Sequence, residues 1–97
     1  MRIPKNRPPT HPGEILREDF LKPMGLTQEK LADELGISFQ RINGIVNGKR
    51  SVTAETALLL AGYFGTTASF WMNAQTTYDL YAARKKIGDR RLAALVS

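Results

Sequence analysis

The stretch Thr27-Gln-Glu-Lys-Leu-Ala-Asp-Glu-Leu-Gly-Ile-Ser-Phe-Gln-Arg-Ile-Asn-Gly-Ile-Val-Asn-Gly48 predicts two short helices joined by a tight turn. Its apolar residues have the three-and-four spacing of helix faces. These residues are Leu31, Leu35, Ile42, Ile45 and Val46. Gly36 can take a left-handed conformation that ends the first helix, and the small Ala32 allows the two helices to cross closely. The pattern is that of a helix-turn-helix, whose second helix can enter a DNA major groove.

The segments around this motif predict three more helices. Residues 11–21 form the first, since Pro12 suits a first helical position and Lys22-Pro-Met-Gly25 should end it. Residues 53–64 and 67–86 form the other two, each starting at a threonine that can cap free N–H groups, as Thr27 and Ser38 can in the motif. No segment has the alternating rhythm of a half-buried strand. We therefore predict an all-α, five-helix fold.

The composition indicates a single globular domain. The 97 residues are 42% hydrophobic and 24% charged, and no apolar run approaches the roughly 20 residues that span a bilayer. We expect a flexible basic arm at 1–10, a DNA-binding and dimerisation domain at 11–86, and a short basic tail at 87–97 that forms a helical turn or no regular structure. Residues 1–12 lack the apolar segment of a signal peptide, so we expect a cytoplasmic protein.

Basic residues are concentrated in three places along a chain of net charge +5. Residues 1–10 and 38–50 each hold three basic residues and no acidic one, and residues 84–97 hold five against one. Clustered cations favour a polyanionic partner, because their binding releases counterions. The arm at 1–10 is either a loose terminus or a segment that touches phosphate or the minor groove.

Side chains on the second motif helix and beside it are the candidate DNA contacts. For base contacts we predict Phe39, Gln40, Arg41, Asn43 and Gly44, where the glycine lets the backbone approach the groove. For phosphate contacts we predict Thr27, Gln28, Ser38, Asn47, Lys49 and Arg50. The alternative is that these are only the solvated face of an amphipathic helix. That alternative is weakened because the face is basic and acid-free beside a complete packing pattern.

Three segments carry a resemblance to a known family. They are His11-Pro-Gly-Glu-Ile-Leu16, Gln40-Arg-Ile-Asn43 and Trp71-Met-Asn-Ala-Gln75. With the motif itself, they resemble the HigA-type (VapI-like) antitoxins of the Xre helix-turn-helix family, over roughly residues 10–86. Many relatives have Arg and Glu where this chain has Phe39 and Gly44, so the operator sequence is not carried over.

The resemblance implies a phage-repressor-like (lambda-repressor-like) domain that acts as a type II antitoxin. Such a protein dimerises, represses its own promoter at a palindromic operator, and neutralises a HigB-type toxin, an mRNA endonuclease of the RelE type. The same group includes stand-alone repressors without a toxin, which is the alternative. The acidic residues of the first two helices either attract a basic toxin or keep the protein soluble. They are Glu14, Glu18, Asp19, Asp33 and Glu34.

The helix at 67–86 is the predicted dimerisation helix. It has more apolar surface than one small core can use, and a palindromic site needs a two-fold partner. We assign Phe70, Leu80 and Tyr81 to the interface, and Trp71 and Tyr78 to the core. The alternative is that its aromatic residues line a ligand pocket.

Other function classes have little support in the sequence. A nucleophile–base pair would have to use His11 alone, since there is no cysteine and no second histidine, so we expect no enzyme, no metal and no cofactor. His11 is expected to cap a helix or lie on the surface. A protein-binding adaptor is the remaining possibility, and a steep salt dependence of DNA binding would separate it from a repressor.

Overall fold

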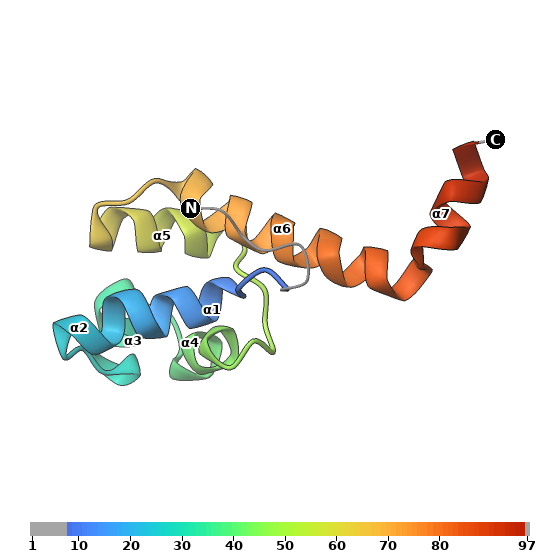
Figure 1. The fold of residues 1–97 in the computed structure, drawn as a ribbon. Coiled ribbons are helices and arrows are strands. Elements are labelled where there is room, and N and C mark those ends of the chain that lie inside the picture. The colour runs from blue at the N-terminus through green and yellow to red at the C-terminus, as the bar shows by residue number, and fades with distance from the viewer. Residues whose placement is uncertain (1–7, 97) are drawn as a thin grey trace.

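The computed structural model describes residues 8–96, which form helices joined by short turns, with no strand in this part of the chain (Figure 1). The elements are α1 (Pro12–Ile15), η1 (Leu16–Leu21), α2 (Lys22–Met24), α3 (Gln28–Leu35), α4 (Phe39–Val46), α5 (Ala54–Phe64), α6 (Ala68–Ile87) and α7 (Asp89–Val96). Because α1, η1 and α2 follow one another without a break, they act as one helix. The all-α prediction is confirmed, with α7 added beyond the five expected helices.

The predicted helix starts are confirmed in the hydrogen bonds of the caps. Thr27, Ser38, Thr53 and Thr67 each accept, through the side-chain oxygen, the N–H of the residue three positions later. Such a bond satisfies one of the four amide groups that a helix start leaves unpaired. Gly36 ends α3 with φ of 70°, as the sequence predicted.

The first helix runs three residues further than expected, which corrects the predicted end at Leu21. Pro23 lies inside it, and only Gly25, in a left-handed conformation, ends it. Proline has no N–H to donate, and its ring crowds the carbonyl four residues earlier. The preceding segment, η1, is π-helical, and its wider turn is the local adjustment that accommodates Pro23.

One hydrophobic core joins all of the helices before α7. Its fully buried large side chains are Leu16, Leu31, Ile42, Ile45, Leu60 and Trp71. Trp71 also donates its indole N–H to Thr66 Oγ1 at 2.8 Å, so its polar atom is satisfied inside the core. Within α5, Leu60 is buried in this core, whereas Leu58 is 66% exposed.

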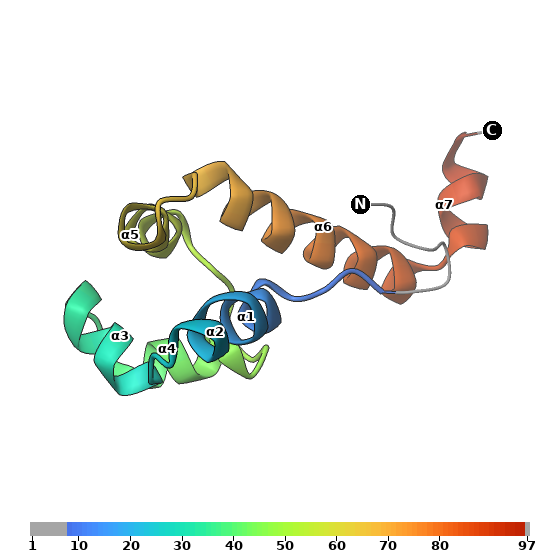
Figure 2. The ribbon, with the colours of Figure 1, turned by 60° about the vertical axis from the view of Figure 1, so that its left-hand side comes forward.

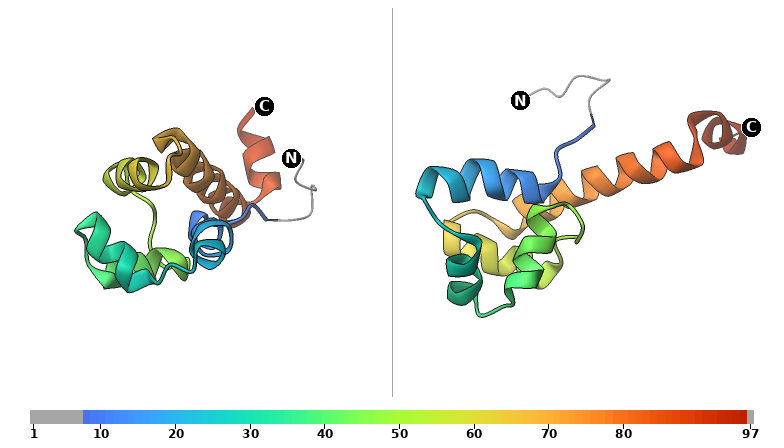
Figure 3. Two further views of the ribbon diagram at one scale, coloured as in Figure 1. Left: turned by 90° about the vertical axis from the view of Figure 1, so that its left-hand side faces the viewer. Right: turned by 90° about the horizontal axis from the view of Figure 1, so that it is seen from below.

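The helices form a compact body from which α6 projects. In Figures 1 and 2, the continuous first helix lies with α3 and α4 on one side, and α5 packs against the start of α6 on the other. The far half of α6 extends beyond the body and carries α7 at its end (Figure 3). The molecule is therefore 51 Å long but only 24 Å and 21 Å across. The tail at 87–97, for which the sequence left two possibilities, is helical through Val96.

Parts of the predicted domain scheme lie outside the described residues. Residues 1–7 of the expected basic arm are among these, so the arm stays a prediction. Within residues 8–96, no helix is both long enough and apolar enough to span a membrane.

Candidate nucleic-acid interface

The two motif helices, α3 and α4, are joined by the three residues Gly36, Ile37 and Ser38. The left-handed Gly36 redirects the chain, and the Ile37 N–H donates to the Ala32 carbonyl at 3.1 Å, which closes the end of α3. Ser38 Oγ then accepts the Arg41 N–H at 3.1 Å and starts α4. Leu31 and Ala32 are buried against α4, so packing and caps together fix the angle between the helices.

The face of α4 that turns away from the core carries the predicted base contacts. Ile42, Ile45 and Val46 are buried, whereas Phe39 and Gln40, at the start of the helix, are exposed. Phe39 keeps 41% of its surface exposed, although it is a large apolar residue. An aromatic side chain held in water at the start of a helix can pack against a thymine methyl group.

Three amide side chains form a hydrogen-bonded chain across α3 and α4. Asn43 Nδ2 donates to Gln28 Oε1 at 3.0 Å, and Asn47 Nδ2 donates to Asn43 Oδ1 at 3.1 Å. The sequence assigned Asn43 to bases and the other two to phosphates. The chain of hydrogen bonds places all three on one surface and fixes their orientations, so the predicted base contact and the predicted phosphate contacts are geometrically coupled.

Arg41 does not extend freely from α4. Its guanidinium lies 3.2 Å from Glu55 Oε1 at the start of α5. Residues 38–50 are acid-free in sequence, yet the fold brings an acidic group to this face from another helix. Both side chains are partly exposed, so the pair is weak, and Arg41 can exchange it for a DNA acceptor at little cost.

Gly44 has a close neighbour that the sequence did not indicate. A Cβ at this position would lie 2.8 Å from both Cγ and Cδ of Arg50. The aliphatic part of Arg50 thus crosses the helix where Gly44 has no side chain. The close approach of Arg50 gives this glycine a structural reason within the chain, and the approach of the Gly44 backbone to the groove stays a prediction.

The loop at 47–53 places the predicted phosphate contacts that follow α4. The amide groups of Lys49 and Arg50 both donate to the Gly44 carbonyl, at 2.8 Å and 3.0 Å, and so close the helix end. Gly48 makes the turn possible with φ of 73°. Lys49 and Arg50 are exposed, and the aliphatic part of Arg50 lies at Gly44, the residue that follows Asn43 of the amide chain. The six predicted phosphate contacts therefore belong to α3, α4 and this loop, which are neighbours in the fold.

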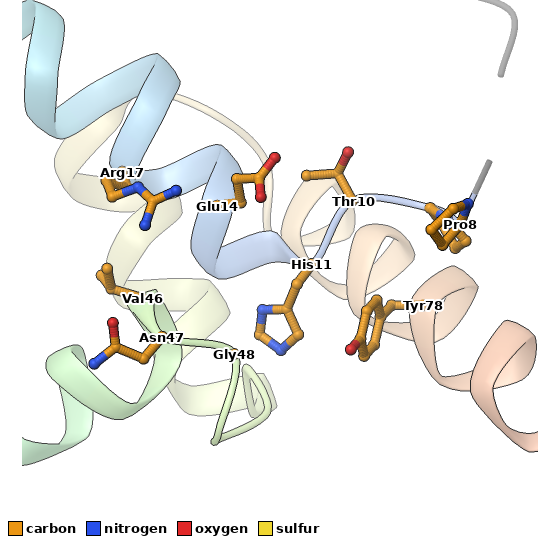
Figure 4. Close-up of a pocket in the computed structure, with 10 residues that line it drawn as sticks. Pro8, Thr10, His11, Glu14, Arg17, Val46, Asn47, Gly48 and Tyr78 are labelled. Atoms are coloured by element: carbon orange, nitrogen blue, oxygen red, sulfur yellow. The ribbon is translucent and has the colours of Figure 1, made fainter.

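A hollow of about 650 Å³ lies beside this loop, between the start of α1 and α6 (Figure 4). His11 and Tyr78 face each other in it, with ring centroids 4.8 Å apart and an edge-to-face geometry. His11 Nδ1 accepts the Gly13 N–H at 2.9 Å, so the predicted capping role of His11 is confirmed. Partial burial lowers the pKa of His11, although the carboxylate of Asp79 opposes this shift.

The lowered pKa of His11 predicts a pH-dependent stability. The neutral ring is favoured in the folded chain, so this stabilisation is complete above the unfolded pKa of 6.5 and declines as the pH falls below it. Protonation of Nδ1 also removes the cap, which contributes about 1 kcal/mol. Thermal unfolding followed from pH 8 to 5 should show this decline, and His11→Asn, a capping residue that does not titrate, should lack it. Identical pH profiles for both proteins would contradict the assignment.

The predicted dimer contacts are positioned along α6. Phe70 and Leu80 are exposed, and Tyr81 is half-buried. Phe70 also packs edge-to-face on Trp71, with centroids 5.1 Å apart, so its orientation is fixed. Trp71 lies in the core as expected, while Tyr78 is only half-buried. The interface assignment of Phe70, Leu80 and Tyr81 remains a prediction.

Two residues that position this surface were not among the predicted site residues. Gly13 is buried, and a Cβ there would lie only 1.6 Å from the Ile45 carbonyl oxygen, so α1 meets the backbone of α4 at this point. Gln75 is buried in α6, and its side chain accepts the N–H of Val52. A polar residue on the apolar stripe of α6 was the available signal for Gln75. Gly13 gave none, since glycine is common near helix starts.

Comparison with known proteins places this interface in a family. Residues 18–71 match the helix-turn-helix family. Virulence-associated protein I of Dichelobacter nodosus is 52% identical over 88 residues, which cover 88% of this chain and 82% of that protein. Antitoxin HigA-1 of Vibrio cholerae is 38% identical over 86 residues, which cover 89% and 80%. A solved structure, the Pseudomonas aeruginosa antitoxin HigA with the higBA promoter, superposes with a TM-score of 0.82 at 41% identity, covering 84% of this chain and 89% of that one.

The chain belongs to the helix-turn-helix family, within its group of HigA-type (VapI-like) antitoxins and regulators. The family resemblance drawn from the sequence is confirmed, as is the repressor-like fold. Several of the matching proteins are named as antitoxins or helix-turn-helix transcriptional regulators, which agrees with the class expected from the sequence. Among residues 8–96, no group of three or more histidine, aspartate or glutamate side chains could hold a metal ion.

Proposed function

We propose that this protein is the antitoxin of a type II toxin–antitoxin system, which represses its own promoter and neutralises a HigB/RelE-type mRNA endonuclease. The observation that carries the DNA-binding part is the surface formed by α3, α4 and the loop at 47–53. Oriented amides, exposed cations and an exposed aromatic residue meet there on a rigid pair of capped helices. The solved relative with its promoter supports the same use of the motif in this chain.

In this proposal, α4 enters the major groove, where Phe39, Gln40, Arg41, Asn43 and Gly44 face the bases. The phosphates of the two flanking strands are contacted by residues around the helix ends. These are Thr27, Gln28, Ser38, Asn47, Lys49 and Arg50. The N–H groups at the start of α3 also point toward this surface and favour an anion.

A palindromic operator requires a homodimer, which we place along the exposed side of α6. The apolar side chains of Phe70 and Leu80 remain exposed on one protomer, and Leu80 keeps 66% of its surface exposed. A second copy covering them would bury apolar surface, which favours association. A two-fold dimer would present two copies of α4, one to each operator half-site.

The proposed binding of a toxin is inferred from the family and from exposed acidic side chains of this chain. Glu14, Asp19, Asp33 and Glu34 are exposed on the first helix and on α3, where they could attract a basic endonuclease. Glu18 differs from them, because hydrogen bonds from Lys22 and Arg17 already lower the pKa of its carboxyl. A stand-alone Xre-type repressor without a toxin is the second candidate, since the DNA-binding surface alone would serve it equally.

Two measurements test the proposal. Binding to the chain's own upstream DNA should be specific and should weaken steeply with salt. With about three to five phosphate contacts per subunit, log K should fall against log salt with a slope of about −5 to −9 for the dimer. A salt-independent affinity would instead favour a protein-binding adaptor.

The toxin is tested by expressing the adjacent reading frame alone and with this chain. If the protein encoded by the adjacent frame arrests growth, and this chain relieves the arrest and co-purifies with it, the antitoxin is supported. If that protein is not toxic, the stand-alone repressor is supported.

A further inference from the structure

Gln75 is a buried polar residue with two specific partners on different elements. Only 4% of its surface is exposed. Its Oε1 accepts the backbone N–H of Val52 at 2.8 Å, and its Nε2 donates to Asp79 Oδ1, one helical turn further along α6, at 2.9 Å. The Gln75 side chain therefore joins α6 to the loop at 47–53.

The Val52 amide needs this partner. Val52 is itself buried, with 2% of its surface exposed, and it lies in the loop between α4 and α5, so no helix supplies an acceptor for its N–H. A buried N–H without an acceptor is strongly disfavoured. The Asp79 carboxylate can only accept hydrogen bonds, so it attracts the Gln75 amide nitrogen and directs the carbonyl oxygen to Val52.

The start of the same loop is held on the end of α4, because the N–H groups of Lys49 and Arg50 donate to the Gly44 carbonyl at 2.8 Å and 3.0 Å. The loop thus has a fixed beginning near Gly48 and a fixed end at Val52. Lys49 and Arg50 are exposed between these two points.

We propose that Gln75 is a positioning residue for DNA binding, which holds the loop at 47–53 so that Lys49 and Arg50 face the phosphates. This inference rests on the proposed function of the motif as the DNA reader. Its physical basis is that the hydrogen bond to Val52 keeps the loop ordered before DNA binds. Without this bond, the loop would have to become ordered each time the protein binds DNA. Phosphate contacts made from Lys49 and Arg50 would then be weakened, while the base contacts from α4 would remain.

The variant Gln75→Leu tests this role, because leucine preserves much of the volume but cannot accept the Val52 N–H. We expect circular dichroism to show a helical, folded chain. Operator binding at about 0.1 M salt should weaken by about tenfold, and the salt slope should become shallower by about 1 for each phosphate that the loop no longer neutralises. Lys49→Ala is the comparator, because it removes one such cation directly and should change the slope in the same direction.

An exchange of partners separates positioning from general loss of stability. In the double variant Gln75→Glu/Asp79→Asn, a glutamate oxygen can accept the Val52 N–H while the asparagine amide donates to the other oxygen. We expect the double variant to restore the wild-type slope and affinity. Gln75→Glu alone should fall between the wild type and Gln75→Leu, because its carboxylate can still accept the Val52 N–H but lies next to the Asp79 carboxylate.

The position of the loop can also be measured without DNA. Amide hydrogen exchange at Val52 should be slow in the wild type and in the double variant, and faster in Gln75→Leu. Unchanged exchange and an unchanged salt slope in Gln75→Leu would overturn the inference, and so would weaker binding with an unchanged slope. If the exchange results are as expected but the wild type does not bind its upstream DNA, the proposed function fails while the hydrogen bond that orders the loop stands.

Discussion

Replacing Gly13 with alanine is expected to destabilise the protein by about 3 kcal/mol, at the upper end of the effects of overpacking. The added Cβ would lie 1.6 Å from the Ile45 carbonyl oxygen and 3.0 Å from the Val46 Cα. Both are backbone atoms, so no side chain can rotate away to relieve the clash. The first helix and α4 would have to separate along the line where they meet, and the packing of the fully buried Leu16 and Ile42 would loosen.

The matched control is Gly62→Ala. Gly62 lies within α5, its φ is not positive, and nothing stands within 4 Å of the position that its Cβ would take. Alanine in the middle of a helix is favoured over glycine by roughly 0.5–1 kcal/mol, so this variant should be more stable than the wild type. Urea or thermal unfolding of the three proteins gives the comparison. A Gly13→Ala variant within about 0.5 kcal/mol of the wild type would show that the two helices are not in contact in solution.

Operator binding should also suffer in Gly13→Ala, because the contact is made with the last turn of α4. The residues after that turn form the loop with Lys49 and Arg50, and displacement of the turn moves them as well. Sequence reasoning treated the residues from His11 to Leu16 as a family signature without a physical reason for the glycine. The structure supplies the reason, since only glycine allows the first helix to lie directly on the backbone of α4.

Local signals accounted for most of the helix boundaries. A threonine or serine before each of four helices has a side-chain oxygen that can cap, and in each case it does so. Gly36 likewise needed only its own conformational freedom to end α3. These features depend on residues a few positions apart, so the sequence is sufficient to predict them.

Features that depend on distant residues were missed. In α5, Leu60 and Thr56 pack inward and Leu58 is exposed, because the neighbouring helices decide which side of α5 is covered. The pairing of Arg41 with Glu55 and the bond from Val52 to Gln75 join residues 14 and 23 positions apart. Nothing in the local pattern indicates such partners, because they depend on how the helices pack around the core.

The last prediction is that substitutions of the proposed base contacts and of the proposed phosphate contacts have different effects on DNA binding. Changing Gln40 or Arg41 to alanine should reduce discrimination between the operator and unrelated DNA, each by roughly 1–3 kcal/mol. Gln40 is exposed on the outer face of α4, and Arg41 needs only to leave Glu55 to reach a base or a phosphate. Changing Lys49 to alanine should instead weaken binding to all DNA about equally, since phosphates are the same in every sequence.

Arg91→Ala is the control for the loss of one positive charge. Arg91 is exposed on α7, at the end of the projecting part of α6, so it is far from the α4 surface (Figure 3). A charge beyond the Debye length, about 10 Å at 0.1 M salt, contributes little to binding at that surface. Gel-shift titrations of each variant on operator and on unrelated DNA measure both the affinity and the discrimination between the two DNAs. If Gln40→Ala and Arg41→Ala left discrimination unchanged, α4 would not be the helix that contacts the bases. If Arg91→Ala weakened binding as much as Lys49→Ala, the total charge rather than the loop would determine affinity.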